Sequence, residues 1–212
     1  MLLQLGCQTV VDVGANQGQF ALAVRHCFPA ARIISFEPLP GPAAVFRRVF
    51  SGDANTSFQQ AAIGPRREIT TMHVSQANDS SSLLPISPVQ TTIFPGTQEV
   101  DTVEVRVAPL DEFVSANELT SPAMLKLDVQ GFEYEALVGC ESLLQHFEFV
   151  YCECSFLELY SGQKLAPEII DWLSARGFGL AGVYSPYYDR LGRAVQADLL
   201  FSHQDNSNVA VS

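Results

Sequence analysis

The first segment whose residues could bind a small molecule is Val11–Gly18, with the sequence VDVGANQG. It joins an apolar run directly to a stretch of helical composition, so its small residues would let a nucleotide-like ligand approach the main chain. Its spacing differs from the GxGxxG of dinucleotide-binding folds, and no GK[ST] follows to hold a triphosphate. The loop therefore favours a nucleotide-like ligand that is not held mainly through phosphates; a tight turn is the alternative interpretation.

Glu37 follows a second apolar run and stands 23 residues after Gly14. A Rossmann-like domain places a carboxylate at this point to accept hydrogen bonds from both hydroxyls of a ribose. Together the loop and Glu37 predict an adenosine-containing ligand. Alone, Glu37 could be a solvated acid at the end of a strand.

Asp128 closes the apolar run Met124–Asp128, which predicts a central strand. Ligands of open α/β sheets lie outside the carboxyl ends of the strands, so we predict that Asp128 is a catalytic residue facing the reacting group of the ligand. Gly131 allows the chain to turn nearby. Glu133, a predicted substrate contact, falls in the first turn of the next helix, where the helix dipole favours an acid in any case.

Glu153 ends the following strand, so it could converge with Asp128 on one acceptor or one metal ion. We predict it as a second catalytic residue, the alternative being an exposed strand end. Two acids are too few to predict a metal site, and none is predicted.

Three further features are candidates for the acceptor side. His73 could serve as an alternative base, although a lone histidine in a strand is more often structural. The polar run Asn78–Ser82 lies in a long loop, where such runs are usually solvated turns. Tyr187, in a loop that contains proline, could line a sugar site.

The elements that would position these residues alternate as in an α/β fold. The long segment Gln76–Gln98 is expected to be a loop, either a binding loop or a linker. Strands are expected at Thr9–Val13, Arg32–Phe36, Phe58–Ala62, Glu68–Val74, Glu99–Val107, Met124–Asp128, Phe149–Glu153, Phe178–Tyr184 and Ala194–Phe201, and helices at Gly18–Cys27, Pro42–Phe50, Phe132–Leu144 and Pro167–Arg176.

Composition narrows the class of protein. The 212 residues are 47% hydrophobic and 17% charged, which is typical of one ordered globular domain, expected over residues 1–202, with a disordered tail at 203–212. A net charge of -11 without clusters of Lys and Arg disfavours nucleic acid as a partner. No apolar run is long enough to span a membrane. Five cysteines without a CxxC pair predict reduced, buried thiols and a cytoplasmic protein.

With these motifs in this order, the chain resembles the FkbM-type methyltransferases, which have the class I S-adenosylmethionine-dependent fold. The resemblance implies a Rossmann-like, mostly parallel seven-stranded sheet with helices on both faces and an antiparallel C-terminal hairpin. It rests on VVDVGANQGQFA (10–21), ISFEPLP (34–40), QAAIG (60–64), NDSSSL (78–83), VAPLDEF (107–113) and LKLDVQGFEYEALVG (125–139).

The same resemblance implies S-adenosyl-L-methionine as the cofactor, and a sulfonium cation suits an acidic pocket without a basic phosphate cradle. It places Glu37 at the ribose and Asp128 beside the cofactor. The residues it implies around the methionine part are Asp12, Gly14, Asn16 and Gly18; those near the adenine are Ala61 and Ala62; and Ala15, Phe20, Pro38, Ser81 and Ser82 complete the implied cofactor site.

The predicted reaction is O-methylation, and the resemblance favours a hydroxyl on a sugar, a glycan or a natural product. Two alternatives stay open at this stage. An NAD-dependent sugar oxidoreductase would also use a glycine loop and a ribose-binding acid, although the missing GxGxxG counts against it. A non-catalytic adenosine-binding module is the other alternative, because a fold does not prove turnover.

Overall fold

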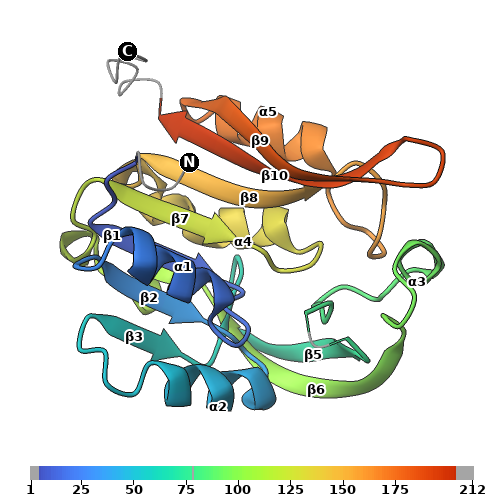
Figure 1. Cartoon of the computed structure of the whole chain (residues 1–212), viewed down its shortest axis with the longest axis horizontal. Helices are drawn as coiled ribbons and strands as arrows, with labels where there is room; N and C mark the ends of the chain where they lie inside the picture. Colours follow the sequence, from blue (N-terminus) through green and yellow to red (C-terminus); the bar gives the residue numbers. More distant parts are fainter. Residues whose placement is uncertain (1–4, 78, 204–212) are drawn as a thin grey trace.

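A seven-stranded sheet forms the centre of the computed structural model, which describes residues 5–77 and 79–203 (Figure 1). Five strands run parallel, and the C-terminal hairpin adds β10, antiparallel to both of its neighbours, and then β9 at the edge. In spatial order the strands are β3 (Thr56–Gln59), β2 (Arg32–Phe36), β1 (Thr9–Val13), β7 (Ala123–Leu127), β8 (Phe149–Ser155), β10 (Ala194–His203) and β9 (Phe178–Tyr188). This is the predicted class I methyltransferase architecture.

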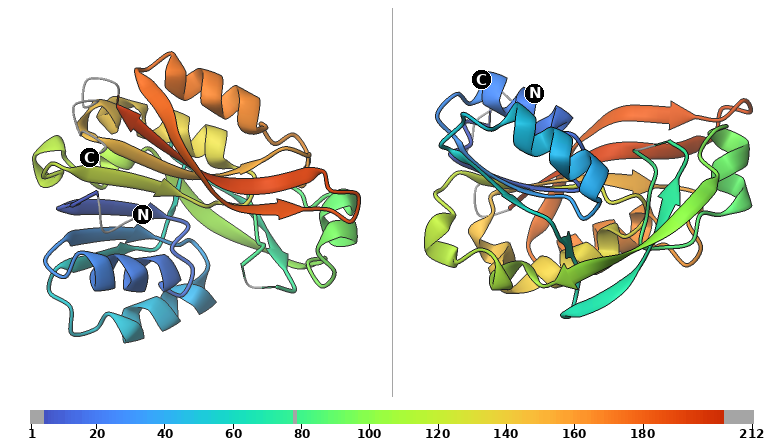
Figure 2. Two further views of the ribbon diagram at one scale, coloured as in Figure 1. Left: turned by 45° about the horizontal axis from the view of Figure 1, so that its top comes forward. Right: turned by 90° about the horizontal axis from the view of Figure 1, so that it is seen from below.

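Helices cover both faces of this sheet, as Figure 2 shows. Every residue of β1 and of β7 is buried, which explains why central parallel strands appear in the sequence as nearly continuous apolar runs. Helices α1 (Gln19–Cys27) and α2 (Pro40–Val49) pack on one face, and α4 (Glu133–Cys140) and α5 (Ala166–Ser174) pack on the other.

A second, three-stranded sheet lies beside the main one. It consists of β4 (Ala62–Ile63), β6 (Glu99–Ala108) and β5 (Glu68–Ser75). The expected single strand Phe58–Ala62 is therefore wrong: β3 ends at Gln59 in the main sheet, and β4 pairs with β6 in the small one. The chain changes sheets at the carboxyl edge of the main sheet, which brings the small sheet next to that edge.

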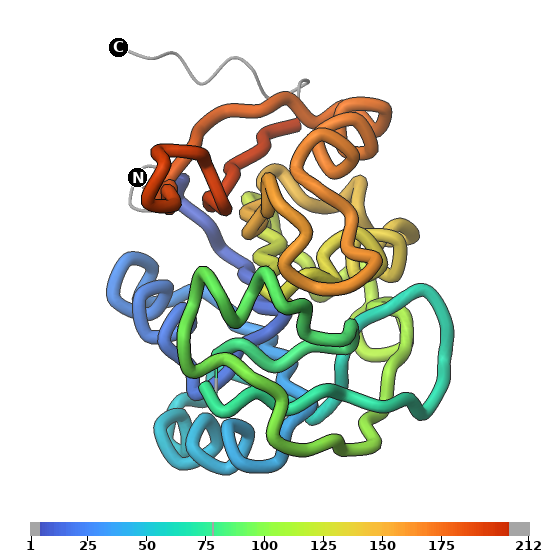
Figure 3. The backbone as a smooth tube through the Cα atoms, turned by 90° about the vertical axis from the view of Figure 1, so that its right-hand side faces the viewer, coloured from blue at the N-terminus to red at the C-terminus, as the bar shows by residue number. Residues whose placement is uncertain are grey.

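The segment between β5 and β6 lies across this edge of the main sheet (Figure 3). It is not a bare loop, because it contains helix α3 (Pro88–Ile93), whose first amide groups are capped by Ser87. Backbone bonds join it to the segment after β8: Ser87 N–H donates to the carbonyl of Leu159, and Ser161 N–H to that of Pro85. These contacts hold α3 over the carboxyl ends of β7 and β8.

Several smaller expectations can be compared with the described residues. The helix expected over Phe132–Leu144 is an α-helix only to Cys140, followed by a 3₁₀-helix over Glu141–His146. Strand β10 extends through His203, and the rest of the expected tail lies outside the described residues.

All five cysteines are free, and all but the half-buried Cys27 are buried. Among the described helices, none has the length and apolar character that crossing a membrane requires.

Candidate active site

Three hollows meet at the carboxyl edge of the main sheet. The first, the main cleft, has a free volume of about 650 Å³, part of it open to solvent. Its apolar walls come from Phe36, Ile63, Met72, Leu83 and Phe132, and its polar lining from Asn16, Glu37, Asp79, Ser81 and Asp128. No Lys, Arg or His belongs to the described lining of this cleft, so it is acidic.

The second, the α1-side hollow, lies next to α1 and is lined by Ala15, Phe20, Lys126, Tyr151 and Asp198, among others. The third, the α3-side hollow, lies below α3 and is lined by Gln90, Phe94, Gln130, Glu153 and Gln196, among others. Asp79 and Asp128 line all three hollows. A group bound at Asp128 could therefore be reached from each of them.

The loop after β1 is shaped by its packing. Gly14 has φ +78°, and a Cβ at this position would lie 1.8 Å from the carbonyl oxygen of Asp128, so no other residue fits. The amides of Gly14 and Ala15 both donate to the carbonyl of Phe36, and the Asn16 amide donates to Glu37. Because these amides are already used within the fold, this part of the loop offers no open cradle of N–H groups for a phosphate.

Glu37 lies at the wall of the main cleft and is only 6% exposed, so it is not a solvated strand end. Oε2 accepts the Asn16 amide at 3.0 Å, and Oε1 accepts the Leu39 amide at 2.8 Å. Burial raises the pKa of Glu37 from its ordinary 4.5 to about 7, although both hydrogen bonds favour the ionised form. Each oxygen keeps a second lone pair, so the carboxylate can still accept a donor from the cleft.

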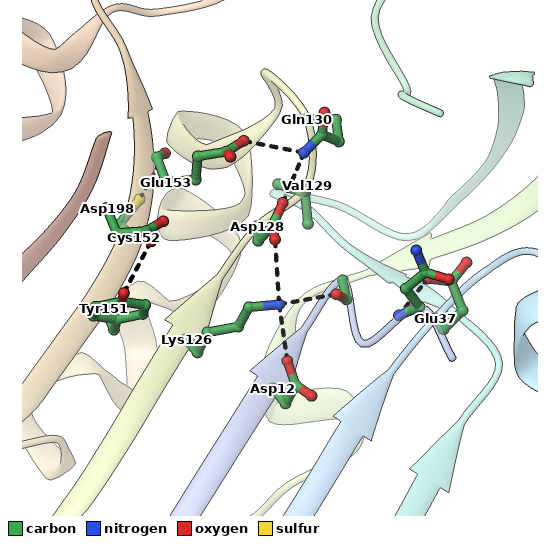
Figure 4. A network of polar contacts seen from close by, with 12 residues as sticks. Asp12, Glu37, Lys126, Asp128, Val129, Gln130, Tyr151, Cys152, Glu153 and Asp198 are labelled. Atoms are coloured by element: carbon green, nitrogen blue, oxygen red, sulfur yellow. Dashed lines mark hydrogen bonds and ion pairs between the residues drawn. The ribbon is translucent and has the colours of Figure 1, made fainter. Parts of the chain in front are cut away.

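A buried lysine connects two of the predicted acids (Figure 4). Asp12 of β1 and Lys126 of β7 are register partners in neighbouring parallel strands, so their side chains lie side by side. Lys126 Nζ lies 3.0 Å from Asp12 Oδ1, 3.8 Å from Asp128 Oδ2 and 2.9 Å from the carbonyl of Gly14. Burial lowers the pKa of Lys126, but the two carboxylates outweigh this effect and the pKa is raised. Lys126 thus stays charged and fixes the end of β7 against the loop.

Asp128 and Glu153 are brought together by an amide. Gln130 Nε2 donates to Asp128 Oδ1 at 2.8 Å and to Glu153 Oε2 at 3.0 Å, and Gln196 Nε2 donates to Glu153 Oε1 at 2.9 Å. Burial, together with the nearby charge of Asp128, raises the pKa of Glu153 well above its ordinary value. The two carboxylates therefore converge on one space, although Glu153 lies within β8 rather than at its end.

The three residues predicted for the acceptor do not line these hollows. Glu133 is 2% exposed, and its Oε1 accepts hydrogen bonds from the backbone amides of Val129 and Gly131. These two bonds stabilise the turn after β7. His73 pairs with Glu99, with 2.8 Å between Nδ1 and Oε2. Tyr187 lies in β9 and not in a loop, and its ring contacts Phe94 with centroids 4.8 Å apart and planes tilted by 41°, which places it behind a wall of the α3-side hollow.

Most residues of the implied cofactor site line the main cleft or the α1-side hollow. Asp12 and Gly18 line no hollow, because Asp12 is buried against Lys126 and a Cβ at Gly18 would lie 2.7 Å from the ring of Phe50. Ser82 is also buried and bonds to its own loop, and Asn78 lies outside the described residues. The main cleft is lined by Gly14, Asn16, Glu37, Pro38, Ala61, Ala62, Ser81 and Asp128, and the α1-side hollow adds Ala15 and Phe20.

Two groups of residues were missed by the sequence reasoning. Lys126 is a charged residue inside an otherwise apolar strand, and it stands one residue before the strand end, as Asp12 does in its own strand. These matching positions could have indicated that the two side chains pair. Gln130 and Gln90 had no such signal, since single glutamines in turns and short helices are ordinary. No group of three or more His, Cys, Asp or Glu among the described residues is arranged to hold a metal ion.

Comparison with known proteins extends this picture. Residues 12–180 match the model of the methyltransferase FkbM domain. The chain is 29% identical to the 2-O-methyltransferase NoeI of Sinorhizobium fredii, over 81% of this chain and 73% of that protein. It is 30% identical to the hexuronic acid methyltransferase AglP of Haloferax volcanii, over 74% of this chain and 63% of that protein.

A solved structure with the same fold is that of SMU.1697c from Streptococcus mutans, in complex with SAH. It superposes with a TM-score of 0.50 at 11% identity, over 94% of this chain and 93% of that one. At this level of identity the similarity concerns the fold.

Proposed function

This chain belongs to the FkbM methyltransferase domain family and is a methyltransferase, and we propose that it transfers the methyl group of S-adenosyl-L-methionine to a hydroxyl oxygen of a sugar, glycan or natural product. The observation that carries the proposal is the main cleft, where Glu37 and Asp128 form part of one cation-free, acidic wall.

The lining of the cleft fits this cofactor. We assign the adenine to the apolar walls near Ala61 and Phe132 and the ribose hydroxyls to the free lone pairs of Glu37. The methionine part would extend past Asn16, whose Oδ1 is buried without a partner among the described residues, toward the α1-side hollow. A positively charged sulfonium near Asp128 would be stabilised by the surrounding carboxylates.

The same features disfavour an NAD-dependent oxidoreductase. A pyrophosphate needs cations or open amide groups, whereas the described lining of the main cleft has no basic residue and the Gly14, Ala15 and Asn16 amides are used. The only cation bordering the neighbouring α1-side hollow, within the described residues, is Lys126, which is paired with Asp12 and Asp128. A nucleoside without phosphates matches this arrangement better.

For the chemical step, the bound cofactor supplies an activated methyl group, and the chain has to place a hydroxyl and remove its proton. Asp128, which borders all three hollows and has a side chain 42% exposed, is our candidate base. As the new carbon–oxygen bond forms and the carbon–sulfur bond breaks, the hydroxyl proton passes to the Asp128 carboxylate. Gln130 and Lys126 hold this carboxylate in position from two sides, with Glu153 as the alternative proton acceptor.

The acceptor class rests on the relatives. One is named for 2-O-methylation and the other for a hexuronic acid, so the first name indicates transfer to oxygen and the second a sugar acid as acceptor. The acidic cleft and the net charge of -11 argue against a nucleic acid. The five free cysteines support a cytoplasmic location.

Calorimetry tests the cofactor assignment. Titration with S-adenosylmethionine and with S-adenosylhomocysteine should give saturable binding, and titration with NAD should give none under the same conditions. Binding of NAD with equal or greater affinity would overturn the proposal. Release of S-adenosylhomocysteine from S-adenosylmethionine in the presence of an acceptor would then exclude a non-catalytic adenosine-binding module.

A further inference from the structure

The α3-side hollow has the position expected of a second binding site. It has a free volume of about 710 Å³, including space open to solvent, and it shares Asp79, Asp128 and Gln130 with the main cleft. A molecule in it would meet a cofactor bound in the main cleft at Asp128. The elements that enclose it come from far apart in the sequence: α3, the turn after β7, β8 and β10.

Charges and amides cover its inner surface. Its acidic residues are Asp79, Asp128 and Glu153, and no Lys, Arg or His occurs among the described residues that line it. Glu153 is fixed from two sides by the amides of Gln130 and Gln196. The donors of both amides are directed at carboxylates, so the surface left for a ligand consists mainly of hydrogen-bond acceptors.

Gln90 is an independent sign that a ligand belongs in this hollow. It is 3% exposed, it lines the hollow, and its Oε1 accepts no hydrogen bond from any described residue. A buried amide oxygen without a donor is costly, and such groups are normally satisfied by protein, water or ligand. Because Gln90 is a lining residue of this hollow, we infer that a ligand bound there supplies the missing donor.

An aromatic wall completes the site. Phe94 lines the hollow and is backed by the ring of Tyr187. An aromatic face carries partial negative charge and suits the C–H groups on one side of a pyranose ring. We propose that the α3-side hollow is the acceptor site, a proposal that rests on the proposed function. The hollow takes a sugar ring that is neutral or carries an amino group, and it excludes sugars that carry a carboxylate or a phosphate.

The exclusion of anionic sugars follows because the described residues that line the hollow include no positive charge. Hydroxyl and ammonium groups are donors and match the three carboxylates and Gln90 Oε1. An anionic sugar would bring a further negative charge into a partly desolvated site where like charges repel strongly. Lys126 cannot compensate, because it is buried between Asp12 and Asp128 and does not line this hollow.

The experiment compares acceptors that differ in one group. The full chain is incubated with methyl-labelled S-adenosylmethionine and with glucosides, glucosaminides or glucuronides of the same aglycone, as monosaccharides and short oligosaccharides. Labelling of the neutral or amino sugar should exceed that of the glucuronide at least about tenfold. The ratio should shrink when ionic strength rises from about 0.01 M to about 0.15 M, because the Debye length falls from about 30 Å to about 8 Å.

Two substitutions tie the selectivity to this hollow. Gln196→Lys places a cation beside Glu153 and should shift the ratio toward the glucuronide by about tenfold. Gln90→Leu keeps the side chain's size and should raise KM for the acceptor several-fold while leaving affinity for S-adenosylhomocysteine unchanged, because Gln90 does not line the main cleft. Val89→Ala, on the exposed side of the same helix, is the matched control and should behave as wild type.

Equal labelling of the glucuronide, or no response of the ratio to Gln196→Lys, would overturn the proposal. So would a failure to label any of these sugars in a protein that binds S-adenosylhomocysteine, and the methyltransferase assignment would survive that result. A wild-type chain that does not bind S-adenosylhomocysteine would instead reject the proposed function itself.

Discussion

Replacing Glu133 by glutamine should stabilise the protein at alkaline pH and not at acid pH. Glu133 is 2% exposed, no cation among the described residues pairs with its carboxyl group, and burial raises the pKa of this group from the ordinary 4.5 to about 7. The hydrogen bonds from Val129 and Gly131 reach the same oxygen, Oε1, and the backbone N–H of Glu133 itself also favours the ionised form. Glutamine keeps Oε1, so the substitution removes the buried charge and preserves the contacts with Val129 and Gly131.

The sign and size follow from proton linkage. Between pH 4.5 and pH 7 the native state holds this proton more tightly than the unfolded state does, so the free energy of unfolding falls as pH rises. At 1.36 kcal/mol for each pH unit, the total loss is about 3 kcal/mol, of which about 2.5 kcal/mol falls between pH 5 and pH 8. Glu37 contributes in the same direction in both proteins, so the difference between variant and wild type isolates Glu133.

Urea unfolding of wild type and Glu133→Gln at closely spaced pH values measures this difference. The gap in free energy of unfolding should open in favour of the variant as pH rises from 5 to 8, with unchanged m-values. A gap that is independent of pH would refute the reasoning. A loss of methyl transfer from a fully folded variant would return Glu133 to the substrate site that the sequence suggested.

The remaining predictions concern the site. Glu37→Gln replaces one oxygen by an NH₂ group that faces a backbone N–H, and it should weaken binding of S-adenosylhomocysteine by about 2 to 3 kcal/mol, or roughly 30- to 150-fold by calorimetry; unchanged affinity would remove Glu37 from the cofactor site. Asp128→Asn should bind S-adenosylhomocysteine nearly normally and lose methyl transfer by about 10² to 10⁴ in single-turnover assays, and full turnover would make Glu153 the next candidate base, because His73 lines none of the three hollows. Lys126→Met leaves Asp12 buried without a partner and should lower the free energy of unfolding by about 3 to 5 kcal/mol, so an unaltered unfolding midpoint would show that the ion pair contributes nothing. Chelation should leave methyl transfer intact; activity lost on chelation and restored by a divalent cation would assign Asp128 and Glu153 to a metal instead.

The main sheet was predictable because its strands carry local signals. Arg32–Phe36 and Thr9–Val13 agree with the predicted strands residue for residue, since parallel strands that are buried on both faces are mostly apolar, and only Arg32 of these residues is exposed. The C-terminal hairpin was predicted in kind but is longer than expected at both strands' ends. Strand β4 was not separable from β3, because its two residues owe their conformation to pairing with β6, 45 residues away.

The candidate site residues that stand at strand ends could be predicted from the sequence. Those that reach the site through tertiary packing could not be predicted. Glu37 and Asp128 both line the main cleft, as we expected of residues that follow strands whose carboxyl ends share one sheet edge. Helix α3 was hidden in the expected loop, although Ser87 followed by Pro88 is a helix-start signal. Nothing local could show that α3 would be held over Asp128 by backbone bonds from Ser87 to Leu159 and from Ser161 to Pro85.

The most direct test of the proposed reaction is mass spectrometry of a cell extract incubated with the wild-type chain and isotopically methyl-labelled S-adenosylmethionine. Transfer to oxygen predicts a product whose mass has increased by one labelled methyl group, carried as a methyl ether on a sugar ring, and an equal amount of S-adenosylhomocysteine. A labelled methyl group on nitrogen or carbon, or no labelled product from a chain that binds the cofactor, would contradict O-methylation of a sugar.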